Sequence, residues 1–254
     1  PRIARIDLTR FETDEIIEIP NTAGGHAWPW FTPTTGYSVP GALFSVPVPT
    51  ADVAIADYAE RFKGMLTFVR ADRPGEMAIA FQLLMPGYNY DIAHSGKGPS
   101  EGWMFFSSYN TEEAHTHLEL NASKNDKDYI AAVNWKRAEQ CVADGRGREM
   151  AADYRHNVMD HATRSARSER RTSVTVLDPS ACKGVVFFLP TPKSPHGVDV
   201  DPTGEDIVAG GKLATVIPVH SATKMLQASL AEAVDGVAID HPGLRYDATL
   251  AGGG

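Results

Sequence analysis

The sequence predicts an all-β fold, part of a β-propeller, with short helical inserts. Three observations carry this prediction: many short strand-like runs, Pro or Gly between nearly all of them, and one segment that recurs along the chain. The expected strands cover residues 3–7, 15–19, 65–71, 76–84, 102–108, 129–134, 173–177, 184–189, 206–209 and 213–218.

Helical spacing is confined to short stretches between these strands. A helix is predicted over 135–143, directly after a strand. A second is predicted over 221–234, where Met225 and Leu230 belong to a set of apolar residues at helical intervals. A third, weaker pattern covers 51–62. Short helices of this kind are inserts in a β protein.

The recurring segment consists of two strand-like runs, a proline and a histidine. In the first copy the runs lead to Pro20 and His26, and in the second they lead to Pro190 and His196. Each copy is interpreted as two strands, joined by a short turn, that end in a loop carrying the histidine. A weaker third copy covers residues 69–94.

The two histidines predict a metal site on the axis of the fold. His26 and His196 are 170 positions apart, and a quarter of this, about 42 residues, lies within the 40–50-residue period of propeller blades. A propeller aims equivalent ends of its blades at a central channel, where imidazoles are good metal ligands. The alternative is that both are structural histidines in blade loops. The strands suffice for only part of a closed ring.

The loop at His196 is rich in residues that restrict the backbone. Pro195 stiffens the loop, and Gly197 permits a close approach. Asp199 and Asp201 either orient the imidazole or cap the following turn. A glycine-rich stretch at 96–100 resembles a phosphate loop, but it lacks the full spacing and an opening helix, so we reject that function.

A second candidate site follows the strand at 102–108. Tyr109 supplies a phenol, and Glu112 and Asp126 supply carboxylates, with backbone carbonyls nearby. Hard oxygen ligands of this kind favour calcium over copper or zinc. The alternative is a solvated loop with an acidic rim.

Composition excludes several classes of function. The net charge of −8 and the absence of a basic stripe argue against a nucleic-acid partner. No apolar run approaches the roughly 20 residues of a membrane span. Cys141 and Cys182 are isolated in the sequence and imply neither a disulfide framework nor a cysteine zinc site. The chain begins with Pro1 in a strand-like run, so we expect a piece of a longer protein.

Four motifs in order along the chain resemble nitrous oxide reductase, most closely its second, Sec-exported clade. They are residues 86–94 (PGYNYDIAH), 107–110 (SSYN), 125–128 (NDKD) and 194–199 (SPHGVD). The resemblance extends over essentially the whole chain. It implies that residues 1–254 are an internal part of the N-terminal propeller domain, which has about seven blades in the intact family, and that the C-terminal cupredoxin domain is absent.

The resemblance also implies a function. The family catalyses the copper-dependent, two-electron reduction of nitrous oxide to dinitrogen and water in denitrification. It is a periplasmic homodimer that receives electrons from a small donor protein such as a c-type cytochrome or a cupredoxin. Its cofactors are a tetranuclear copper–sulfide cluster, calcium, and a dinuclear copper centre that is expected only in the missing C-terminal domain.

Site residues follow from matching the motifs position by position. His26 and His196 match copper-cluster ligands, and Asp91 resembles a carboxylate that lies behind such ligands. The residues that match the calcium site are Tyr109, Glu112, Leu120 through its carbonyl, Asp126 and Ser194. Ser194 stands where many members have asparagine. As an isolated chain we expect no turnover. The alternative function is a non-catalytic β-propeller binding module with incidental loop histidines.

Overall fold

The computed structural model describes residues 2–21, 42–45, 62–70, 75–86, 90–108, 129–154, 171–191, 195–211 and 217–227. Strands dominate these residues and helices are few and short, so the predicted all-β class is confirmed. Among the described residues, no helix is long and apolar enough to cross a membrane.

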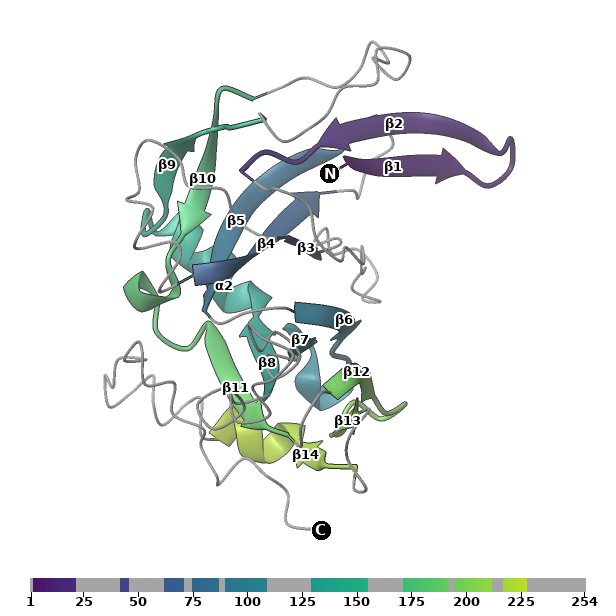
Figure 1. Cartoon of the computed structure of the whole chain (residues 1–254), viewed down its shortest axis with the longest axis vertical. Coiled ribbons are helices and arrows are strands. Elements are labelled where there is room, and N and C mark those ends of the chain that lie inside the picture. Colours follow the sequence, from purple (N-terminus) through teal and green to yellow (C-terminus); the bar gives the residue numbers. More distant parts are fainter. Residues whose placement is uncertain are drawn as a thin grey trace, which may run out of the picture.

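The strands of the described residues form four sheets (Figure 1). The hairpin sheet contains β1 (Arg2–Asp7) and β2 (Glu12–Glu18). The five-stranded sheet, in spatial order, contains β3 (Ala42–Ser45), β4 (Phe62–Arg70), β5 (Ala78–Pro86), β10 (Ser173–Leu177) and β9 (Arg148–Ala151). The four-stranded sheet contains β11 (Val186–Pro190), β8 (Tyr129–Asn134), β7 (Trp103–Ser108) and β6 (Tyr90–Ser95). The three-stranded sheet contains β12 (Pro195–Val200), β13 (Asp206–Gly211) and β14 (Val219–Ser221).

The four-stranded sheet is buried on both faces. On β7, Met104 and Phe106 belong to the core shared with the five-stranded sheet, whereas Trp103 and Phe105 belong to the core shared with the three-stranded sheet. The same alternation continues on β8 and β11. Successive side chains of a strand point to opposite faces, so a sheet covered on both sides needs a nearly continuous apolar run. This explains why these strands were recognisable in the sequence.

Helix α2 (Trp135–Ala143) has the bounds that its sequence pattern predicts. The side chain of Asn134 caps its first turn by accepting a hydrogen bond from the backbone N–H of Arg137 at 2.9 Å. The helix buries Trp135, Ala138 and Cys141, which are spaced by three residues and share one face. That face packs into the core between the five-stranded and four-stranded sheets.

The two cysteines form a disulfide, contrary to the sequence-based expectation that they are isolated. Cys141 and Cys182 are 41 positions apart, with their Cα atoms 6.2 Å apart. Two cysteines at this separation carry no local signal of pairing, because the contact between α2 and the segment before β11 is made by the tertiary fold.

The interpretation of the recurring segment as a repeated hairpin is correct for its first copy and wrong for its second. In the first copy, β1 pairs with β2. In the second, β10 pairs with β5 and β9 in one sheet, whereas β11 pairs with β8 in another. Runs of similar pattern therefore occupy different places because their pairing partners lie far away in the sequence.

Several other elements differ from the predictions. The strands β3, β6, β9 and β12 were not expected; β9, for example, is a short edge strand with one buried residue, Met150. Of the strand expected over 213–218, residues 213–216 lie outside the described part, residues 217 and 218 are not in a strand, and β14 begins at Val219. Of the helix expected over 221–234, residues 222–227 are helical, Ser221 ends β14, and residues 228–234 lie outside the described part. The helix expected over 51–62 also lies outside it, apart from Phe62, which begins β4.

Candidate metal centre

Four strand ends meet at one edge of the four-stranded sheet. Backbone pairing joins Tyr90 to Ser108, Ser108 to Tyr129, and Tyr129 to Pro190. These residues are the start of β6, the end of β7, the start of β8 and the end of β11. Neighbouring strands are about 4.8 Å apart, so the row of four positions spans roughly 14 Å. The segments that leave this edge begin close together.

The predicted calcium ligands belong to those segments. Tyr109 directly follows β7, Asp126 precedes β8 by three residues, and Ser194 follows β11 by four residues. Glu112 and Leu120 lie in the same connection from β7 to β8. All five residues lie outside the described part of the structure.

The chemistry of this set suits a hard cation. The donors are a phenol, two carboxylates, a backbone carbonyl and a hydroxyl, all of them oxygen. Calcium takes six to eight oxygen ligands in a flexible coordination geometry. The residues therefore fit calcium in type.

The predicted copper residues are only partly described. His26 lies outside the described residues, but Asn21, the last described residue before it, is held by hydrogen bonds. Asn21 is fully buried and has a positive φ of 62°. Its side-chain amide donates to Gln82 Oε1 at 3.0 Å, and its carbonyl oxygen accepts from the backbone N–H of Asp153 at 2.8 Å. The segment that carries His26 therefore departs from a fixed point on the five-stranded sheet.

His196 was expected in a loop, and the structure places its backbone in β12 instead. The pairing register with β13 shifts between Pro195 and Gly197, so His196 is the extra residue of a β-bulge. The side chains of His196 and Asp91 lie outside the described part, although the backbone of Asp91 is in β6. Strand β12 packs against β6 and β7, which brings the two strands that carry these residues together.

An unpredicted contact joins those two strands. His94 Nε2 on β6 lies 3.2 Å from Asp199 Oδ1 on β12, and His94 Nδ1 lies 3.0 Å from the carbonyl oxygen of Ser95. Both ring nitrogens therefore face oxygen acceptors. The Asp199 side chain is 81% exposed, so this contact contributes at most about 1 kcal/mol. Asp199 thus orients a histidine, but this histidine is His94.

Asp201 caps the turn between β12 and β13, the other role that the sequence offered. Its Oδ1 accepts from the backbone N–H of Asp206 at 3.0 Å, and its Oδ2 accepts from the backbone N–H and the hydroxyl of Thr203 at 3.0 and 2.7 Å. The hydrogen bond from Asp206, followed by that from the Thr203 hydroxyl, holds the pKa of Asp201 well below its ordinary value of 3.8. The charged carboxylate of Asp201 thereby stabilises the turn.

The glycine-rich stretch at 96–100 has a structural role. Gly98 begins a short 3₁₀ turn, η1 (Gly98–Ser100), with a positive φ of 52°. This turn packs against the β12–β13 turn so closely that a Cβ on Gly204 would lie 1.8 Å from the carbonyl oxygen of Lys97. Gly98 and Gly204 are therefore explained by the close approach of the backbones of these two turns.

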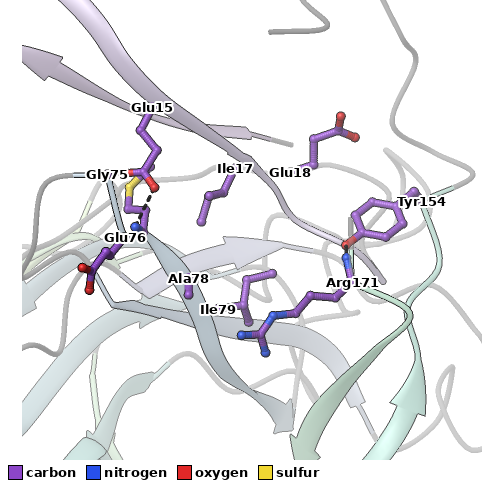
Figure 2. Close-up of a pocket in the computed structure, with 10 residues that line it drawn as sticks. Glu15, Ile17, Glu18, Gly75, Glu76, Ala78, Ile79, Tyr154 and Arg171 are labelled. Atoms are coloured by element: carbon purple, nitrogen blue, oxygen red, sulfur yellow. Dashed lines mark hydrogen bonds between the residues drawn. The ribbon is translucent and has the colours of Figure 1, made fainter. Parts of the chain in front are cut away.

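A cavity of about 480 Å³ lies elsewhere, beside β2 and the start of β5 (Figure 2). Glu15 is buried in its wall and accepts a hydrogen bond from the backbone N–H of Met77 at 2.6 Å. On another side, the backbone N–H of Arg171 donates to the hydroxyl of Tyr154 at 3.1 Å. None of the predicted ligands lines this cavity.

The described residues contain no group of three or more His, Cys, Asp or Glu side chains placed to hold a metal ion. The described part of the candidate centre consists of its framework: the strand ends, the bulge at His196 and the His94–Asp199 contact. Sequence reasoning missed that contact because β6 was not predicted, although its segment lay within the weaker third copy of the recurring motif.

Comparison with known proteins identifies relatives at the level of sequence. No family model matches the chain. It is 28% identical over 233 residues to the nitrous-oxide reductase of Cupriavidus necator, covering 89% of this chain and 32% of that protein. It is 26% identical over 248 residues to that of Ralstonia nicotianae, covering 93% and 35% respectively. For the Pseudomonas fluorescens enzyme the values are 26% over 220 residues, 85% and 30%.

The described residues define an all-β protein of mostly antiparallel sheets that pack on one another through shared apolar cores. Within that class, the chain resembles the nitrous-oxide reductases over most of its length, which confirms the resemblance stated from its motifs. The chain spans about a third of the length of the curated relatives it matches.

Proposed function

We propose that residues 1–254 form part of the propeller domain of a nitrous oxide reductase, an oxidoreductase that reduces nitrous oxide to dinitrogen and water. The observation that carries the proposal is the similarity to nitrous-oxide reductases, which in these comparisons covers 85–93% of the chain. The motifs quoted from the sequence lie in segments of both proposed metal sites, and they support the proposal alongside this similarity.

The arrangement of the sheets supports a propeller. Propeller blades are antiparallel sheets of four strands that pack face to face around a central channel. The four-stranded sheet is antiparallel throughout, and it shares one core with the five-stranded sheet and another with the three-stranded sheet. We interpret these three sheets as successive blades. The parallel pairing of β10 with β5 is a departure from the regular blade.

The calcium site is proposed at the edge where Tyr90, Ser108, Tyr129 and Pro190 meet. Tyr109, Glu112, Asp126 and Ser194, with the carbonyl of Leu120, would hold the ion. By tying the connection between β7 and β8 to the segment after β11, calcium would fix the approach to β12 and therefore to His196.

The copper role is proposed for His26 and His196, with Asp91 behind them. Imidazole and sulfide are ligands that copper favours. When bound, a tetranuclear copper–sulfide cluster would supply the electrons for the two-electron reduction. The part of this chain is to hold the imidazoles in place. The segment that carries His26 begins after the buried Asn21, and the backbone of His196 lies in a bulge three residues before Asp199.

The remaining parts of the proposal concern the whole enzyme. Cys141 and Cys182 are bonded to each other, so neither is available as a thiolate for a dinuclear copper centre, which we assign to a cupredoxin domain. A buried disulfide fits the periplasm, because disulfides persist in oxidising compartments. A homodimer and a small electron-donor protein complete the proposed assembly.

Calorimetric titration of the chain with calcium tests the proposal. We expect one site, and we expect Glu112→Ala or Asp126→Ala to abolish binding because each removes a charged ligand. Glu113→Ala is the matched control, since it removes the same charge one residue away, and it should bind as the unaltered chain does.

Equal calcium binding in all three variants would contradict the site and would favour a propeller binding module instead. A second measurement addresses catalysis. The isolated chain, incubated with copper and sulfide, should not reduce nitrous oxide, because His26 and His196 are too few ligands for a tetranuclear cluster. Turnover by this chain would overturn the assignment of the remaining ligands and of electron transfer to other parts of the enzyme.

A further inference from the structure

The disulfide closes the end of the β8–β11 strand pair that lies opposite the candidate metal centre. Beyond β8, helix α2 carries Cys141 in its last turn, and Cys182 lies four residues before β11 begins. The backbone N–H of Asn134 donates to the carbonyl oxygen of Val185 at 2.8 Å. Residues 134–141, the disulfide, residues 182–185 and this hydrogen bond therefore form a closed ring at the end of the pair.

Both sulfur atoms lie inside the protein core. Cys141 and Cys182 are each 0% exposed and belong to the cluster between the five-stranded and four-stranded sheets. Thiol–disulfide exchange requires a thiolate to reach a sulfur atom directly. In the folded chain the surrounding core side chains cover both cysteines, so an external thiolate cannot contact either sulfur atom.

We propose that this chain is the substrate of a thiol-oxidation step that precedes closure of the core, and that the disulfide then fixes the strand pair whose opposite ends lead to Asp126 and Ser194. The second half of this inference rests on the proposed calcium site. The first half depends only on the bond and its burial. The partner is a protein of the thiol–disulfide oxidoreductase class with a reactive disulfide.

The reaction balances in two exchange steps. The thiolate of one cysteine attacks the partner's disulfide, forming a mixed disulfide and releasing one partner thiolate. The second cysteine thiolate attacks the sulfur of the first, which forms the Cys141–Cys182 bond and releases the second partner thiolate. The chain loses two electrons and two protons, and the partner's disulfide is reduced to a dithiol.

The first test follows thiol accessibility by intact mass after labelling with N-ethylmaleimide in denaturant. The chain, purified after export to an oxidising compartment, should take up no label without reductant and two labels after reduction in denaturant. When the folded chain is treated with a phosphine reductant, the reductant is removed and the chain is then labelled in denaturant, it should still take up no label. Labelling without reductant, or equal reduction rates in the folded and the denatured chain, would overturn the proposal.

The second test addresses the order of events. Reduced, denatured chain is refolded either with an oxidised thiol–disulfide oxidoreductase present from the start or with the same oxidant added after folding. We expect oxidation to be slower in the second case by roughly tenfold or more, since the thiols are then buried. Equal rates would show that the folded chain admits the oxidant and would contradict the proposal.

The third test links the disulfide to the metal centre. The double variant Cys141→Ala/Cys182→Ala should bind calcium more weakly than the oxidised chain, whereas Glu113→Ala should not. Equal binding would overturn the second half of the inference. Absence of calcium binding in the oxidised chain would overturn the proposed site, and with it that second half, but would leave the thiol measurements valid, so the two failures are distinguishable.

Discussion

Asn21 and Gln82 are 61 positions apart in the sequence, and their buried side chains are joined by a hydrogen bond of 3.0 Å. Gln82 also donates to the carbonyl oxygen of Pro20 and to the hydroxyl of Thr67, each at 3.0 Å. Every polar atom of the Gln82 side chain thus has a partner, although the residue is fully buried on β5. This network fixes the point from which the segment carrying His26 departs.

Replacement of Gln82 should test the network. Gln82→Leu keeps a similar volume but leaves buried partners on Asn21, Pro20 and Thr67 without their hydrogen bonds. We expect a loss of about 2–3 kcal/mol in the free energy of unfolding, measured by urea denaturation. Gln140→Leu on the exposed face of α2 is the control and should change stability by less than about 0.5 kcal/mol. Similar values for both variants would contradict the network.

A pair of glycine variants should separate backbone strain from steric collision. Gly204 and Gly145 both have positive φ, 81° and 77°, but a Cβ on Gly145 would meet nothing within 4 Å. Gly145→Ala should therefore cost about 1 kcal/mol from its left-handed conformation alone. Gly204→Ala should cost at least about 1 kcal/mol more, because its Cβ would collide with the backbone of Lys97. Thermal unfolding of both variants gives the comparison, and equal losses would contradict the close approach.

The burial of both faces of the four-stranded sheet predicts equal sensitivity at adjacent residues. Phe105 and Phe106 are each 0% exposed and lie on opposite faces of β7. Each substitution to Ala should reduce the free energy of unfolding by about 3–5 kcal/mol. Phe11→Ala serves as the control, because Phe11 is 82% exposed, and it should change stability by at most about 0.5 kcal/mol. A small effect at Phe105 would mean that the three-stranded sheet does not cover this face.

The acid sensitivity of the β12–β13 turn follows from the lowered pKa of Asp201. The hydrogen bonds to this carboxylate hold its pKa in the folded chain below the ordinary value of 3.8. Its contribution to stability is therefore fully present above that value and is lost as the pH falls toward the lower, folded-state pKa. Asp201→Asn should make stability less dependent on pH below about 4, as measured by unfolding at a series of pH values. An unchanged acid slope would show that this carboxylate is not held in the turn.

The elements that were predictable have local causes. The strand at 129–134 and helix α2 were expected with the bounds they have, because an apolar run, a capping Asn134 and a regular apolar spacing specify them within a few residues. β6 and β9 were missed because their alternation is short and partly polar. The ligand assignments at Tyr109, Glu112, Leu120, Asp126, Ser194, His26 and His196 stay predictions, supported by the strand ends that flank most of them.

The sequence by itself determined the all-β class, the strands buried on both faces, the helix after β8 and the resemblance to nitrous-oxide reductases. These depend on the order and spacing of neighbouring residues, which act through local backbone geometry and burial. The tertiary structure decided that β10 and β11 enter different sheets, that Cys141 meets Cys182 and that Asn21 meets Gln82. Each of these contacts joins positions that are distant in the sequence, and the packing of whole sheets brings them together.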